Sequence, residues 1–126
     1  MQLPRDRFET LAFDLAAEIL AELPEHLRVE AEAVVLEIAD HPSLEQARTM
    51  EAGEDLLGLY EGVPLIHRHF NTTLLQPDRI TLFQHALQSI ARTEAELREQ
   101  IRVTLIHDLG HFFGFEEDEL DERGWG

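Results

Sequence analysis

The chain has 126 residues, 44% of them hydrophobic and 29% charged, and this composition suits one domain with a single core. Its formal charge of −16 argues against a nucleic-acid partner, because the phosphate backbone would be repelled. The absence of cysteine excludes disulfides and thiolate metal sites. We therefore predict one domain over residues 1–126. We place it in the cytoplasm, with no membrane partner, because the sequence has no signal-peptide pattern and no apolar run of about 20 residues.

The first half of the chain predicts a helix and then a strand. Apolar residues recur at helical spacing from Arg5 to Leu23, and Pro24 stops the pattern. The segment Val29–Ile38 alternates at first and is apolar later, so we predict a strand. A helix remains the alternative there, because Ala, Glu and Leu favour helices. We predict a loop with some helix over residues 42–54, because residues 44–50 have a helix-forming composition.

The second half predicts two short strands and a long helix. Residues 56–65 are rich in glycine and apolar side chains, which indicates a short strand and a turn. Pro77 is a breaker and alternating β-forming residues follow it, so we predict a strand over residues 77–83. Thr93 and Glu96 match a capping box that starts the long helix. Five residues of that helix lie within about 40° of one line along its surface. They are apolar at first and polar later: Leu97, Ile101, Thr104, Asp108 and His111.

The polar end of this helix carries a metal-binding pattern. His107 and His111 are four residues apart, so both imidazoles lie on one helix face and can reach one ion. Gly114 allows the chain to turn back, and Glu117 follows three residues later. Two histidines and one carboxylate, with an open position for water, are the ligands of a hydrolytic zinc site. The spacing fits the pattern H-E-x-x-H-x-x-G-x-x-H, with Asp108 in place of the glutamate and Glu117 in place of the third histidine.

Asp108 is the candidate general base. A carboxylate on an inward helix face is costly to bury without a partner, and a metal-activated water would provide one. Aspartate is one methylene shorter than glutamate, and a misplacement of about 1 Å can cost on the order of 10²-fold in rate. The alternative is a structural role, or a role in orienting a histidine ligand.

Other candidates have plainer interpretations. His67 and His69 have a possible ligand spacing, but an exposed loop explains them as well. We interpret His26, His41 and His85 as isolated histidines with surface or core contacts. Tyr60 and the Gly62-Val63-Pro64 segment fit either the lining of a substrate cleft or core packing and a turn.

Three segments in this order resemble the small zincin-like metallopeptidase family of bacteria, which has a minimal zincin domain. They are LGLYEGVPL (57–65), PDRITLF (77–83) and VTLIHDLGHFFG (103–114). The resemblance implies an α+β fold with an N-terminal helix, a small mixed sheet and the motif helix packed on it. It also implies Zn2+ at His107 and His111, with an acidic third ligand after Gly114. Glu117 has the matching position, and Glu116, Asp118 and Glu119 are the alternatives.

We therefore predict a zinc metallopeptidase that hydrolyses a peptide or another amide bond, with a peptide or protein as substrate. The alternatives are a weak or inactive zincin fold that binds a peptide or protein, and a structural metal. The sequence leaves the oligomeric state open.

Overall fold

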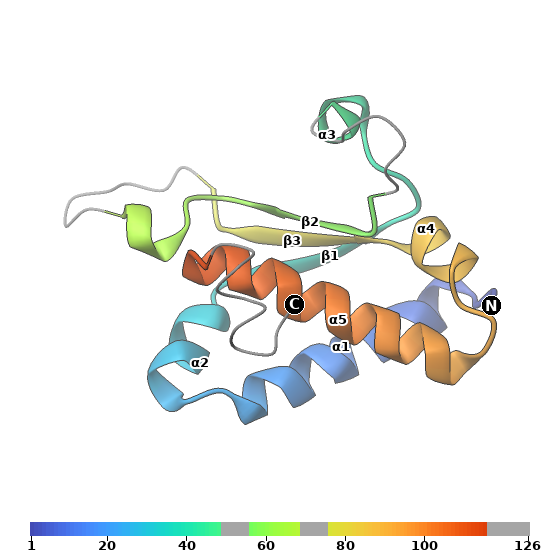
Figure 1. Cartoon of the computed structure of the whole chain (residues 1–126), viewed down its shortest axis with the longest axis horizontal. Coiled ribbons are helices and arrows are strands. Elements are labelled where there is room, and N and C mark those ends of the chain that lie inside the picture. The colour runs from blue at the N-terminus through green and yellow to red at the C-terminus, as the bar shows by residue number, and fades with distance from the viewer. Residues whose placement is uncertain (49–55, 69–75, 116–126) are drawn as a thin grey trace.

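The computed structural model describes residues 1–48, 56–68 and 76–115, which form a small sheet with the long helices on one side of it (Figure 1). In chain order the elements are α1 (Arg5–Glu22), α2 (Glu25–Ala31), β1 (Val35–Ala39), α3 (Leu44–Ala47), β2 (Gly58–Glu61), the 3-10 helix η1 (Leu65–His67), β3 (Arg79–Phe83), α4 (Gln84–Ser89) and α5 (Glu94–Phe113).

Among the described residues the sheet has three strands in the order β1-β3-β2. β1 runs parallel to β3, with Val35 opposite Arg79, and β2 runs antiparallel to β3, with Gly58 opposite Leu82. α5 crosses one face of this sheet, and α1 packs on the other side of α5 (Figure 1). The predicted α+β class, with an N-terminal helix, a small mixed sheet and the motif helix, is confirmed.

The core lies where α5 meets α1 and the sheet. α1 contributes the buried face that its helical spacing predicts, including Phe8, Leu15 and Ile19. β3 contributes Ile80 and Leu82, and the members from α5 are Leu97, Ile101, Leu105, Leu109, Phe112 and Phe113. Since α5 is buried on two sides, its position is fixed along most of its length.

The predicted strand over Val29–Ile38 is wrong in its first part. Residues up to Ala31 belong to α2, and the strand starts only at Val35. Pro24 precedes α2 as its N-cap residue, and the Ala- and Glu-rich sequence after it favours a helix once the chain has this start. α4, directly after β3, is not predicted by the sequence patterns. The extent of the domain, residues 1–126, stays a prediction.

Both ends of α5 show the sequence signals of helix termini. Thr93 Oγ1 accepts the Glu96 N–H at 3.1 Å, as predicted, but Glu96 Oε2 accepts the N–H of Arg92 at 2.7 Å rather than that of Thr93. At the other end Gly114 has φ +91°, and the Phe115 N–H donates to the Gly110 carbonyl at 2.9 Å. This left-handed turn ends the helix after the histidine pair. Within the described residues, no helix is long and apolar enough to cross a membrane.

Candidate metal centre

His107 and His111 face each other on the last turns of α5. Their Nε2 atoms are 3.0 Å apart and their ring planes meet at 81°. Zn–N bonds are about 2.0–2.1 Å long, so two nitrogens on one zinc ion can lie up to about 4 Å apart. The observed separation therefore allows one ion to contact both imidazoles, as the four-residue spacing predicts.

The third ligand is not among the described residues. Over residues 1–48, 56–68 and 76–115, no group of three His, Asp or Glu side chains could hold a metal. Glu117, the predicted ligand, lies outside the described residues, as do its alternatives Glu116, Asp118 and Glu119. Gly114 makes the predicted turn before them, and a Cβ atom at this position would lie 2.5 Å from Ile66 Cγ1. Both the positive φ and the contact with Ile66 favour glycine at this position.

Asp108 points from α5 onto the sheet and is only 4% exposed. Its Oδ2 atom lies 2.6 Å from the position that a Cβ atom would take at Gly58 in β2, so the missing side chain of Gly58 makes room for the carboxylate. Oδ2 has no hydrogen-bond partner among the described residues. Burial raises the pKa of the Asp108 carboxyl to about 7. The two imidazoles are nitrogen ligands of the kind that zinc takes, and the unpartnered Oδ2 of Asp108 on the same helix is an acceptor that a metal-bound water would satisfy.

A cavity of about 340 Å³ opens beside His111. Tyr60, Gly62 and Pro64 line it, as one interpretation of the sequence expected. Gly114, Phe115 and His67 complete the lining. His67 lies on η1 and is exposed, while His69 lies outside the described residues.

Asp78, just before β3, is a residue of this region that the sequence patterns do not single out. It is 6% exposed, and its Oδ1 accepts the Tyr60 hydroxyl at 3.0 Å and the Val63 N–H at 3.1 Å. Its Oδ2 forms an ion pair with Arg68. Burial and the hydrogen bond to Asp78 raise the pKa of Tyr60. The only sequence signal for Asp78 is its position as an acidic residue after Pro77, and this pattern is equally typical of an ordinary turn.

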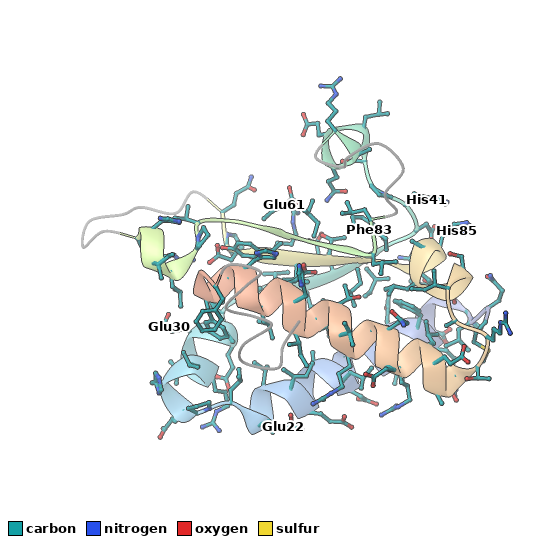
Figure 2. All side chains as sticks on the ribbon, viewed as in Figure 1. Glu22, Glu30, His41, Glu61, Phe83 and His85 are labelled. Atoms are coloured by element: carbon teal, nitrogen blue, oxygen red, sulfur yellow. The ribbon has the colours of Figure 1, made fainter. Side chains whose placement is uncertain are left out.

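The other histidines lie away from this cavity. His41 and His85, interpreted as isolated, lie next to each other, with ring centroids 4.8 Å apart and His85 in α4 (Figure 2). They follow the carboxyl ends of the parallel strands β1 and β3, which brings them to the same edge of the sheet. His26 is an exposed residue of α2.

The raised pKa of Asp108 predicts how the stability of the metal-free protein changes with pH. Between about pH 4 and pH 7 the folded state holds this proton and the unfolded state has lost it. The free energy of unfolding should therefore fall as pH rises through this range, by up to about 1.4 kcal/mol per pH unit from this group, and level off above it.

Urea denaturation of EDTA-treated protein at several pH values would measure this dependence. Asp108→Asn should remove this part of the pH slope. The exposed Asp14 on α1 provides the control Asp14→Asn, which should keep the slope. Identical slopes in the wild type and in Asp108→Asn would show that the carboxyl of Asp108 is not protonated in the folded state.

Two comparisons with known proteins bear on this site. A protein of Gimesia maris named hydroxymethylphosphonate dioxygenase is 33% identical to the chain over 90 residues, which is 70% of this chain and 40% of that protein. The chain thus spans less than half of the length of this relative. The zincin-like metallopeptidase family matches residues 31–125, which include the sheet, the cavity and α5. Because this match covers most of the chain, the protein belongs to the zincin-like metallopeptidase family, which implies that it binds a metal ion.

Proposed function

We propose that the protein is a zinc-dependent peptidase that hydrolyses a peptide or another amide bond. The observation that carries the proposal is the 3.0 Å separation of the Nε2 atoms of His107 and His111, at the edge of a cavity. The buried carboxylate of Asp108 follows His107 directly in α5. Two metal-binding imidazoles, a carboxylate and a cavity are the parts that metal-assisted hydrolysis requires.

In this proposal His107, His111 and Glu117 hold the zinc ion. The bound ion would supply an acidified water, with a pKa of about 7, and would polarise the substrate carbonyl. Asp108 takes a proton from the attacking water and delivers it to the leaving amine as the C–N bond breaks. A base works best when its pKa is near the working pH, and burial moves the pKa of Asp108 in that direction, to about 7. The positive charge of the ion would lower this pKa again.

The cavity supports a short or extended peptide as substrate. Its volume of about 340 Å³ is near the lower end of the range for ligand pockets, about 300–1,000 Å³. β2 borders the cavity and is an edge strand of the described sheet, so an extended peptide could pair with it. The charge of −16 favours neutral or cationic substrates over nucleic acids. Location in the cytoplasm stays a prediction, which cell fractionation would test.

Two other functions use the same residues. A zincin fold with a weak or absent base would bind a peptide or protein without cleaving it, and the aspartate in place of glutamate supports this alternative. Two histidines and one carboxylate are also the ligands of non-haem Fe(II) oxygenases. The relative named as a dioxygenase supports this second alternative. The identity of the metal separates the oxygenase from the peptidase.

The protein purified after growth with zinc and iron should contain about one zinc ion per chain. Replacing both His107 and His111 by Ala should abolish stoichiometric zinc, because two of its three protein ligands are lost. Replacing both His41 and His85 by Ala is the matched control and should keep the zinc. Elemental analysis measures these contents. Zinc retained by the first double variant would mean that the site is elsewhere, and iron in place of zinc would favour an oxygenase.

A second prediction separates Glu117 from its acidic neighbours. Glu117→Ala should weaken zinc binding by about 10-fold or more, whereas Glu119→Ala should change it little. Competition with a chromogenic chelator measures both affinities. Equal losses would mean that the acidic segment acts through its general negative charge, and the assignment of Glu117 would be wrong.

A third prediction concerns Asp108. Asp108→Asn should keep the zinc and lower kcat by at least about 10²-fold, because an amide cannot accept the proton. The control Asp14→Asn should keep the zinc and the wild-type kcat. Asp108→Glu should keep the zinc and support turnover of a mixed peptide library, since glutamate has the longer reach. If zinc-loaded wild type and Asp108→Glu are both inactive, the peptidase proposal fails. The alternative of a zincin fold that binds a peptide or protein without cleaving it then remains.

A further inference from the structure

We propose that His67 is a catalytic residue of this site, whose ring N–H donates to the carbonyl oxygen of the bond that is cleaved as this oxygen becomes negative. We infer further that Asp78 positions His67. This inference rests on the proposed peptidase function and adds a residue from a different element of the fold.

The cavity brings His67 and His111 to one site. η1 carries His67 and α5 carries His111, and both side chains line the same space of about 340 Å³. Within the described residues, His67 does not join the histidine pair in a three-ligand group. In this proposal His67 acts on a molecule in the cavity and is not a ligand of the metal. A peptide group held next to His111 would have its oxygen within the same cavity as His67.

The turn that carries His67 is fixed by a partly buried ion pair. Arg68 follows η1 directly, and its guanidinium pairs with the buried carboxylate of Asp78. The Arg68 Nε–H also donates to the Val63 carbonyl at 2.9 Å. On the opposite side of the turn, Asp78 Oδ1 accepts the Val63 N–H and the Tyr60 hydroxyl. One carboxylate thus binds both ends of the turn, so the position of η1 depends on it.

The same residues connect this turn to the helix of the histidine pair. The Arg68 guanidinium carbon lies 5.5 Å from the centre of the Phe112 ring, and Phe112 is the neighbour of His111 in α5. Tyr60 packs edge-on against Phe112 with ring centroids 6.0 Å apart. At Gly62, φ is +156° and a Cβ atom would lie 1.8 Å from Asp78 Oδ1, so the turn requires glycine there. The arrangement sets the distance between His67 and His111 before a substrate binds.

A hydrogen-bond donor at this position fits the charge that hydrolysis produces. The carbonyl oxygen becomes negative when water attacks, and a donor that meets it lowers the barrier. His67 keeps its proton throughout, since Asp108 carries the proton from the water to the amine. Loss of one such donor costs about 10²–10³-fold in kcat in other hydrolases. Glutamine also has an N–H donor, so His67→Gln should retain part of the function.

The first experiment measures kcat, KM and zinc content with the zinc-loaded full chain and a mixed fluorogenic peptide library. His67→Ala should lower kcat by about 10²-fold with little change in KM or zinc content, and His67→Gln should recover part of the loss. His85→Ala is the control, since His85 is an exposed histidine outside this cavity, and it should match the wild type. Asp78→Asn should also lower kcat. Combined with His67→Ala it should add little further loss, because both changes remove the same interaction, the hydrogen bond from His67. Additive losses would show that Asp78 does not act through His67.

The second experiment does not need turnover. Leucine hydroxamate can bind a metal and offers a carbonyl oxygen, and calorimetry measures its affinity. His67→Ala should weaken this binding by about 10-fold or more while zinc content stays the same, and His67→Gln should weaken it less. If the wild type binds the hydroxamate or cleaves peptides and His67→Ala behaves identically in both experiments, the role of His67 is wrong and the peptidase proposal stands. If the variant lacking His107 and His111 binds the hydroxamate as well as the wild type, or the wild type neither binds nor cleaves, the proposed function itself fails and His67 has no such role.

Discussion

The close contact of α5 with the sheet is the constraint on which the rest of the structure depends. α5 lies between α1 and the sheet, and its apolar residues form much of the core. At one point a carboxylate replaces the apolar side chains, and there Gly58 provides the room that Asp108 needs. The helix that supports the fold therefore also positions the candidate metal ligands. A rigid, buried helix holds His107 and His111 more accurately than a surface loop would.

This arrangement buries one carboxyl group whose ionised form is unfavourable in the folded protein. The buried carboxyl of Asp108 has a raised pKa, and its Oδ2 has no hydrogen-bond partner in the described part of the chain. Such a group destabilises a metal-free fold at neutral pH, because ionisation is easier in the unfolded chain. A divalent cation nearby would favour the ionised form. Metal binding and folding stability should therefore be coupled in this protein.

The cavity is formed by two parts of the fold that are distant in sequence. α5 provides His111 and the turn at Gly114, and the segment after β2 provides Tyr60, Pro64 and His67. The ion pair of Asp78 and Arg68 connects the two parts, since Arg68 also covers the ring of Phe112. Loss of either partner of such a pair leaves the other charge uncompensated, so the pair favours one geometry. Here that geometry is the relative position of the two walls of the cavity.

The sequence by itself determined the elements with strong local signals. The apolar period of α1, the N-cap Thr93 and Gly114 at the end of α5 are local signals, and the structure confirms each. The four-residue spacing of the histidines is also local, and in the structure their imidazoles face each other. The assignment over Val29–Ile38 was wrong in part, because a short segment of mixed propensity takes its structure from its surroundings. Only the tertiary structure revealed that Gly58 makes room for Asp108, that Asp78 fixes the turn before His67, and that His41 lies beside His85. These contacts join residues far apart in the chain, and no local pattern encodes such a pairing.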